Sequence, residues 1–327
     1  MDDSRPVLSD WPRATRRTMA VEVCETWFRD GLQGWPTVLA LGEKLRVLEA
    51  VVRAGVREID VTSLVSPRVT PQFADAEDVL ASIAEPVRVR VLAANARGAD
   101  RAVDAHNRLR PIDICGIPFS ASESHNLVNL HKDHSAHRVE VARMADTLNA
   151  AGIQPLLGVA TAFGCPIEGA VDRDVVLSLV EWGRSIGIGR IMLGDTTGVA
   201  DPRSVASLFH EATTTWPDLR FVAHFHDNRG CGIANALTAI AFGAGTVDAS
   251  LGGVGGEPAS VDQGFVGEGG NVVTEDLVAI LQRMEIATGV DLPALIDAGA
   301  LAELILGVQL HSKLQRTSPP TPVGQES

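Results

Sequence analysis

Residues 220–226, RFVAHFH, are one of the strand-like runs of the chain and carry its sharpest chemical signal. The run is short, apolar and rich in β-favouring residues, which predicts a buried strand. It places His224 and His226 two positions apart, and side chains at i and i+2 of a strand point to the same face. Both imidazoles can therefore reach one metal ion. The alternative is a pair of buried histidines held by hydrogen bonds inside the protein.

Seven similar runs recur along the chain, and stretches with helical periodicity separate them. The predicted strands are residues 20–27, 57–64, 87–94, 111–118, 154–161, 190–194, 220–226 and 246–251. The predicted helices are residues 37–54, 74–84, 98–108, 135–151, 172–187, 202–215, 230–243 and 274–288, with Asp172 and Asp201 as N-caps. Strand–helix alternation predicts parallel strands with right-handed crossovers. Eight units favour a closed (β/α)₈ TIM barrel over the alternative, an open doubly wound sheet.

The length of 327 residues suits one barrel, which needs about 250 residues, with short additions. We expect an N-terminal extension at 1–19 and a single catalytic barrel domain at 20–288. A short C-terminal helical extension should follow at 289–314. The Pro/Ser-rich tail at 315–327 is typical of disorder.

Composition restricts the partners of the chain. The net charge of −13 argues against a nucleic-acid partner, since such proteins usually present a basic face. No apolar run approaches the roughly 18 residues that span a bilayer, and the N-terminus lacks the apolar core of a signal peptide. The four cysteines are isolated, which favours reduced thiols. We therefore expect a cytoplasmic protein with a small-molecule substrate and no membrane partner.

Polar residues recur where the predicted strands end, and a TIM barrel carries its active site at those ends. Asp30 on a neighbouring strand would complete a metal site with His224 and His226. These ligands suit Mg²⁺ or Mn²⁺ best, with Zn²⁺ or Co²⁺ as alternatives. Arg29 beside the metal would stabilise a developing enolate oxygen, or else form a salt bridge inside the barrel. The candidate substrate-binding residues are Gln33, Ser63, Ser120, His125 and Thr161.

A glycine-rich loop, GGVGGEPASVDQGFVGEGGN (252–271), follows the last predicted strand. It lacks the Lys-Ser/Thr of a P-loop, so nucleotide binding by that mechanism is not expected. A mobile lid that carries a catalytic side chain, Glu257, is the specific hypothesis. A plain flexible connection is the alternative.

The motifs in order resemble one enzyme family. They are RDGLQ (29–33), TSLVSPRVTPQ (62–72), FSASESHNLVN (119–129), AFGCPIEG (162–169), GDTTGV (194–199), HFHDNRG (224–230), DASLGGVGG (248–256) and GNVVTEDLV (270–278). The sequence resembles the hydroxymethylglutaryl-CoA lyases, metal-dependent barrel enzymes related to isopropylmalate and homocitrate synthases. AFGCPIEG and GNVVTEDLV are more similar to the lyases than to the synthases.

The resemblance implies Asp30, His224, His226 and Asn271 as metal ligands and Arg29 as the group that polarises the substrate carbonyl. It further implies that Asp195 lies beside the metal as a catalytic residue and that Glu275 supports the loop. A homodimer is also implied. The implied reaction breaks the Cα–Cβ bond of a hydroxyacyl-CoA and leaves a ketone and an acyl-CoA enolate.

Two positions depart from the lyase pattern. Glu257 stands where the lyases carry a catalytic Cys, and Asp60 stands where they carry a catalytic Glu, one methylene longer. We therefore expect cleavage of a β-hydroxy acid or β-hydroxyacyl-CoA related to, but other than, hydroxymethylglutaryl-CoA. The alternatives are a Claisen-type synthase that joins an acyl-CoA to a keto acid, and a non-catalytic barrel.

Overall fold

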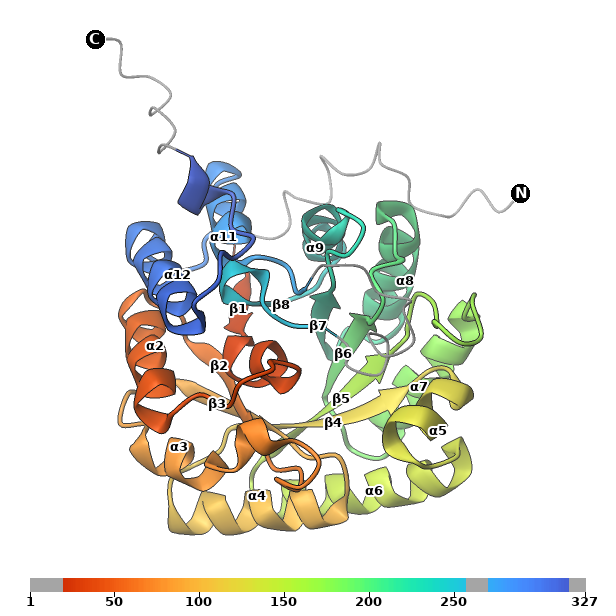
Figure 1. Cartoon of the computed structure of the whole chain (residues 1–327). Helices are drawn as coiled ribbons and strands as arrows, with labels where there is room; N and C mark the ends of the chain where they lie inside the picture. The colour runs from red at the N-terminus through yellow and green to blue at the C-terminus, as the bar shows by residue number, and fades with distance from the viewer. Residues whose placement is uncertain (1–19, 257–269, 318–327) are drawn as a thin grey trace.

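Eight parallel strands close into a barrel in the computed structural model, which describes residues 20–256 and 270–317. Each strand pairs with its neighbours in sequence order, and β1 also pairs with β8, which closes the ring. Figure 1 shows the strands at the centre and the helices around them. The predicted TIM barrel is confirmed, and the closure excludes the open sheet. The strands are β1 (Glu22–Glu25), β2 (Glu58–Ser63), β3 (Arg88–Leu92), β4 (Ile114–Ser120), β5 (Gln154–Ala160), β6 (Arg190–Asp195), β7 (Arg220–Phe225) and β8 (Thr246–Ala249).

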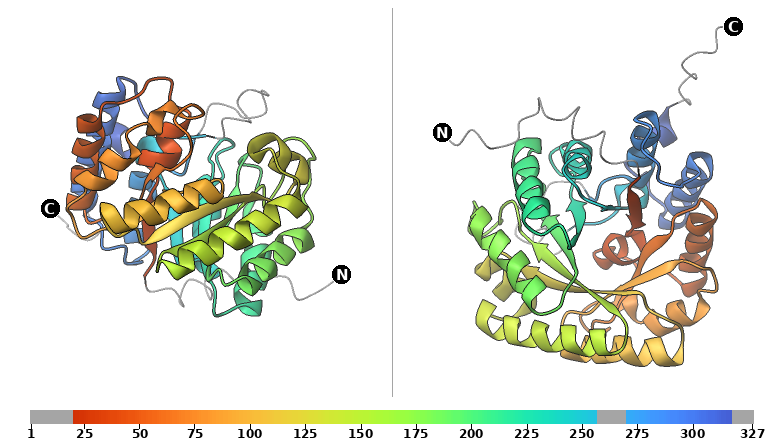
Figure 2. Two further views of the ribbon diagram at one scale, coloured as in Figure 1. Left: turned by 90° about the horizontal axis from the view of Figure 1, so that it is seen from below. Right: turned by 180° about the vertical axis from the view of Figure 1, so that it is seen from behind.

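An outer ring of helices covers the barrel, as both views in Figure 2 show. The ring helices that follow the strands are α2 (Leu41–Arg53), α3 (Ala76–Ser82), α4 (Ala96–Arg108), α6 (His134–Ala150), α7 (Arg173–Ser185), α8 (Pro202–Thr215), α9 (Gly232–Ala241) and α11 (Thr274–Arg283). Asp172 caps α7 and Asp201 caps α8 through their side-chain oxygens, as predicted. The short helix α5 (Glu123–Leu130), capped by Ser122, was not predicted as a helix. Among the described residues, no helix is both long and apolar enough to cross a membrane.

The first predicted strand, residues 20–27, is too long. The strand ends at Glu25, and Trp27–Gly31 form a π-helical turn, η3. Trp27 and Phe28 are buried and meet edge to face, with ring centroids 5.0 Å apart. Burial of these two rings explains why the apolar pattern looks like a continued strand. The turn carries Arg29 and Asp30, and single π turns are frequent at functional sites.

The C-terminal residues form α12 (Leu292–Leu306) and a 3₁₀ turn, η6 (Leu314–Arg316). In Figure 1, α12 lies beside α2 on the outer ring. The carboxylate of Asp276 accepts hydrogen bonds from the backbone N–H groups of Lys313 and Leu314. These contacts hold η6, so the expectation of disorder from residue 315 is wrong for residues 315 and 316. The expected N-terminal extension at 1–19 and the tail from 318 lie outside the described residues.

The barrel interior is divided in its chemistry. On one side Ile114, Leu156 and Val222 form a separate apolar cluster with Met192. Elsewhere in the interior, buried charged residues form ion pairs with one another. The ion pairs there are Arg190 Nη2 with Glu58 Oε1 at 2.8 Å and Arg90 Nη2 with Asp248 Oδ1 at 2.8 Å.

Removal of one buried partner tests this arrangement. Arg190→Met leaves the Glu58 carboxylate, which is fully buried, without its nearest cation. Arg88 at 3.5 Å and Arg90 at 3.7 Å still face Glu58, so the loss comes mainly from the hydrogen bonds between Arg190 and this carboxylate. We expect the free energy of unfolding to fall by about 2 kcal/mol, since hydrogen bonds to a buried charged group contribute on that scale. Urea denaturation measures the change. The control, Arg184→Met, removes an exposed partner of Asp218 and should have much less effect. Equal losses in the two variants would contradict the interpretation.

Candidate active site

A cavity of about 220 Å³ opens among the carboxyl ends of the strands. Its walls include charged residues from η3, β2, β3 and β7 and apolar residues from β3 to β6. Of the residues proposed from the sequence, those that line it are Arg29, Asp30, Gln33, Asp60, His224 and His226. Side chains separated by almost two hundred positions thus meet in one enclosed space.

Asp30, His224 and His226 offer one ligand atom each, and these atoms lie within 4.8 Å of one another. His224 Nε2 is 3.2 Å from His226 Nε2, and His226 Nε2 is 3.8 Å from Asp30 Oδ2. Two nitrogens that each lie roughly 2.1 Å from one cation, at a right angle, are about 3 Å apart. The spacing of the two imidazoles therefore fits a shared divalent ion.

Asn271 lies against this group. It forms an isolated β-bridge with His226, and its Nδ2 donates to Asp30 Oδ2 at 2.6 Å. Its Oδ1 is buried and has no hydrogen-bond partner within residues 20–256 and 270–317. A buried amide oxygen without a donor is unusual, and a cation would satisfy it. The donor set of one carboxylate, two imidazoles and one amide oxygen fits a divalent metal.

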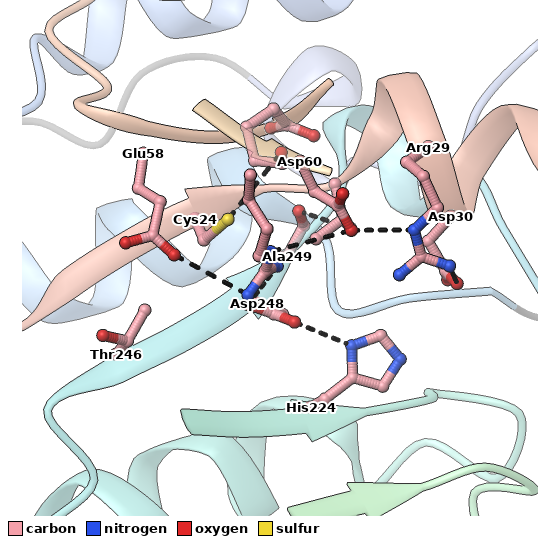
Figure 3. Close-up of polar contacts among 12 residues, drawn as sticks. Cys24, Arg29, Asp30, Glu58, Asp60, His224, Thr246, Asp248 and Ala249 are labelled. Carbon is pink, nitrogen blue, oxygen red and sulfur yellow. Dashed lines mark hydrogen bonds and ion pairs between the residues drawn. The ribbon is translucent and has the colours of Figure 1, made fainter. Parts of the chain in front are cut away.

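Asp248 orients the first histidine from behind. Its Oδ2 lies 3.2 Å from His224 Nδ1, and its Oδ1 lies 2.8 Å from Arg90 Nη2. Figure 3 shows His224 on β7 directed toward Asp248 on β8. Burial opposes ionisation of Asp248, but Arg90 and His224 outweigh it and lower its pKa. A carboxylate at Nδ1 leaves Nε2 of His224 for the metal, which is the usual support of a metal-bound histidine.

Arg29 joins the metal group to Asp60. Its Nε donates to Asp60 Oδ2 at 2.7 Å, and its Nη1 donates to Asp30 Oδ1 at 2.7 Å (Figure 3). Arg29 is buried, so the salt bridge expected as an alternative exists and fixes the guanidinium at the cavity. Burial raises the pKa of Asp60 despite the nearby Arg29 and Arg90. Within the described part of the chain, Asp60 Oδ1 is buried without a hydrogen-bond partner.

Asp195 and Ser63 lie beside the cavity without lining it. Asp195 is buried, and its two oxygens accept from the backbone N–H groups of Val199 at 2.9 Å and Ala200 at 3.0 Å. Ser63 Oγ accepts from Val65 N at 3.3 Å. Both side chains shape the loops that follow their strands. A catalytic role for Asp195 and a substrate contact for Ser63 stay predictions.

A buried hydrogen-bond network outside the cavity lining includes Ser120, His125 and Thr161. Ser120 Oγ is 2.7 Å from His125 Nδ1, and Thr161 Oγ1 accepts from Ser122 N at 3.1 Å. Thr161 has a positive φ of 55°, a strained backbone for a β-branched residue, and its N–H donates to Thr196 Oγ1 at 2.8 Å. None of the three is among the cavity-lining residues that the structure describes. Their proposed contact with substrate stays a prediction.

The sequence interpretation did not identify Arg90 or Asp248 as part of the site. The signal for Arg90 was available, because Arg88-Val89-Arg90-Val91 places an arginine on a strand of an all-parallel barrel. Strands of that kind are buried on both faces, so a central arginine needs buried carboxylates. Asp248 lies three residues before the predicted end of its strand and shows no comparable signal.

Glu275 holds the start of the glycine-rich loop, as the resemblance implies. Its two carboxylate oxygens accept from Gly252 N at 3.2 and 3.0 Å. Gln315 Nε2 donates to the same carboxyl group at 3.1 Å. Burial raises the pKa of Glu275 to about 8. Gly256 lines the cavity, and the next residue, Glu257, lies outside the described residues.

The fold and the site define a metal-dependent barrel enzyme, and the comparisons with known proteins give its family. Residues 20–302 match the HMGL-like family, so the chain belongs to this family. The hydroxymethylglutaryl-CoA lyase YngG of Bacillus subtilis is 33% identical over 295 residues, which cover 90% of this chain and 95% of that protein. The (R)-citramalyl-CoA lyase of Chloroflexus aurantiacus is 32% identical over 316 residues, covering 93% and 96%.

A solved structure agrees with these relatives. An HMG-CoA lyase from Acinetobacter baumannii, in complex with coenzyme A and 3-methylmalate, superposes with a TM-score of 0.84 at 32% identity and covers 97% of this chain and 100% of that one. The chain is accordingly a carbon–carbon lyase of the hydroxymethylglutaryl-CoA lyase type. The condensing synthase and the non-catalytic barrel are not supported.

The support of His224 by Asp248 predicts a metal-affinity effect. Asp248→Asn removes the negative charge behind His224 and should weaken Mn²⁺ binding about 10- to 100-fold. Isothermal titration calorimetry of the purified protein measures the affinity, and circular dichroism confirms that the variant is folded. Asp218→Asn, at an exposed position, is the control and should bind as the parent does. Unchanged affinity in Asp248→Asn would exclude the orienting role.

The raised pKa of Glu275 predicts a pH effect on stability. The folded carboxyl has a pKa of about 8 against an ordinary 4.5, so the folded protein holds the proton more tightly than the unfolded chain. Stability therefore falls as pH rises from about 4.5 to 8. Glu275→Gln removes this penalty while its amide oxygen still accepts from Gly252. Urea denaturation between pH 5 and 9 should show the variant gaining stability relative to the parent as pH rises. A difference independent of pH would refute the assignment.

Proposed function

We propose that the protein cleaves the Cα–Cβ bond of a β-hydroxyacyl-CoA, or of the corresponding free acid, and releases a carbonyl compound and an acyl product. The observation that carries this proposal is the convergence of Arg29, Asp30, Asp60 and the two histidines on one wall of the cavity. The lyase relatives and the neighbour bound to coenzyme A and 3-methylmalate support a thioester and a hydroxy acid as ligands.

We propose Mg²⁺ or Mn²⁺ as the metal, with Zn²⁺ or Co²⁺ as second candidates, held by Asp30, His224, His226 and Asn271. Oxygen ligands beside two imidazoles suit these ions. When bound, the ion would polarise the hydroxyl and carbonyl oxygens of the substrate.

Asp60 is the proposed base. Its Oδ2 is held by Arg29, so Oδ1 can accept the proton of the β-hydroxyl group. Burial raises the pKa of Asp60, which makes the carboxylate a better proton acceptor. The hydroxyl carbon then becomes a carbonyl carbon as the Cα–Cβ bond breaks.

Arg29 is the proposed stabiliser of the enolate. Its Nε and Nη1 hold the two carboxylates, and Nη2 takes part in neither contact. Nη2 would donate to the acyl oxygen, where negative charge develops when the electron pair of the broken bond moves to Cα. Proton transfer to Cα completes the reaction, and we propose Glu257 as its donor, in place of the family Cys. Because that donor differs, we propose a substrate other than hydroxymethylglutaryl-CoA. Asp195 would act beside this site by holding the loop after β6.

We further propose a homodimer, as the family resemblance implies, and a cytoplasmic location, as the composition and the N-terminal sequence favour. Light scattering of the purified chain measures the mass in solution. A monomer over the working concentration range would refute the dimer.

The reaction class is tested with a panel of β-hydroxyacyl-CoA substrates and saturating Mn²⁺, with products identified by mass spectrometry. On any substrate that is cleaved, Arg29→Gln should lower kcat about 10²- to 10³-fold, since it removes a donor to the developing oxyanion. The affinity of the Arg29→Gln variant for Mn²⁺ is the control, and it should match that of the parent if the metal site is intact. Glu257→Gln should also lower kcat, and Glu257→Cys shows whether the family donor restores it. Absence of cleavage across the panel would refute the proposed function.

A further inference from the structure

The charged residues of the cavity gather on one side. Arg29 and Asp30 come from η3, Asp60 from β2, Arg90 from β3 and His224 from β7. This side holds the metal group and the proposed base. The hydroxyl and acyl oxygens of a substrate would therefore face it, and the carbon substituents of the substrate would face the opposite wall.

The opposite wall is apolar and carries small residues. The side from β3 to β6 presents Leu92, Ala94, Gly116, Ile117, Pro118, Leu156, Gly158, Ala160 and Met192. Gly116 and Gly158 lie on neighbouring strands, where Gly116 pairs with Leu156 and Pro118 pairs with Gly158. The absence of side chains at these two glycines leaves room in the wall. Leu156 pairs with Gly116 and Met192 pairs with Gly158, and both side chains belong to the apolar cluster inside the barrel.

The two cations that line the cavity already have carboxylate partners. Arg29 is paired with Asp30 and Asp60. Arg90 lies 2.8 Å from Asp248 Oδ1 and 3.7 Å from both Asp60 Oδ2 and Glu58 Oε1. No further Lys or Arg lines the cavity in the described ranges, and the segment 257–269 contains no Lys, Arg or His. Uncharged polar residues also line the cavity, namely Gln33, Thr70, Asn129 and Thr196, and they could hydrogen-bond a carboxylate without neutralising it. A carboxylate on the far end of a substrate would thus lack a cation to pair with, and its desolvation would be costly.

Resting on the proposed function, we infer that the hydroxyl-bearing carbon of the substrate carries an uncharged alkyl group, and that this group lies against Gly116, Gly158 and Met192. A substrate R(CH₃)C(OH)–CH₂–CO–S-CoA would lose its hydroxyl proton and break the Cα–Cβ bond. The ketone R–CO–CH₃ leaves, and the enolate takes one proton to give acetyl-CoA. Atoms and charge balance without an oxidant or reductant.

A matched pair of substrates tests the inference. One is 3-hydroxy-3-methylglutaryl-CoA, and the other is 3-hydroxy-3,5-dimethylhexanoyl-CoA, in which an isopropyl group replaces the carboxylate with nearly the same shape. With saturating Mn²⁺, kcat/KM should be at least tenfold greater for the neutral substrate, and 4-methylpentan-2-one should appear. An equal or greater kcat/KM for the acid would overturn the inference, and with it the choice of a substrate other than hydroxymethylglutaryl-CoA, while the proposed cleavage of a Cα–Cβ bond would stand.

If neither compound is cleaved, their binding affinities separate the proposed cleavage reaction from the inference of an uncharged alkyl group. Loss of cleavage would count against the proposed function alone. Calorimetric affinities of both compounds for the Mn²⁺-loaded protein would then decide the inference. Tighter binding of the neutral compound supports it, and equal or tighter binding of the acid overturns it.

A single added methyl group tests the location of the alkyl group. A Cβ at residue 158 would lie 3.7 Å from Ile117 O and 3.8 Å from Met192 Sδ, which are ordinary contacts. Gly158→Ala should therefore fold and narrow the wall. The ratio of kcat/KM for the isobutyl substrate to that for 3-hydroxy-3-methylbutanoyl-CoA should fall roughly tenfold or more, since one methylene in a pocket has effects of that size.

Gly116→Ala gives an independent second variant, because its Cβ would meet Val91 O at 3.6 Å and Leu156 Cδ2 at 3.8 Å. The matched control is Gly189→Ala, at an exposed position where an added Cβ meets nothing within 4 Å. The control should keep the parent ratio. An unchanged ratio in both Gly116→Ala and Gly158→Ala would overturn the placement of the alkyl group.

Discussion

The ion pair between Arg90 and Asp248 is the interaction on which the site depends. Arg90 belongs to β3 and Asp248 to β8, so the pair crosses the interior past β1 and β2. Asp248 in turn fixes His224, whose Nε2 faces His226. Asp248 thus takes part both in the packing of the barrel interior and in the orientation of a candidate metal ligand. Buried carboxylates and guanidinium groups would be costly singly, and only the closed ring of strands places them in contact.

This constraint divides the interior into two parts with different tasks. The charged part carries the metal group and the proposed acid–base chemistry, and its residues hold one another in place. The apolar part is built on β3 to β6 and consists mainly of aliphatic side chains, although β6 also carries Arg190, which pairs with Glu58 at 2.8 Å. In the proposed function, the metal-binding end of a substrate would face the charged residues that hold one another in place, while its carbon substituents would face the mainly aliphatic wall. Relatives in the same family act on more than one acyl-CoA, which agrees with such a division.

The sequence was sufficient for the barrel and for the shared face of His224 and His226 because both leave periodic local signals. Strand–helix alternation predicted the eight strands, and the spacing of His224 and His226 predicted their shared face. The π turn at Trp27–Gly31 escaped prediction because buried aromatic residues look alike in a strand and in a tight turn. Ser120 and Thr161 are polar residues at strand ends, yet they form hydrogen bonds within the loops. The polarity of a residue does not tell whether its side chain points into the cavity or away from it. The pattern around Arg90 indicates a buried arginine but not its partners, because Asp248 comes from β8; the room at the two wall glycines likewise depends on side chains from neighbouring strands.

The two wall glycines also bear on how such an enzyme diversifies. Each lies on a strand whose backbone tolerates a side chain, and a first methyl group at either position meets its neighbours at ordinary contact distances. Neither residue touches the ion pairs that hold the metal ligands. Evolution can therefore alter the accepted acyl group one carbon at a time, by single substitutions, while inheriting the catalytic half unchanged. Among descendants of this barrel, substrate specificity would therefore be expected to change faster than the reaction that is catalysed.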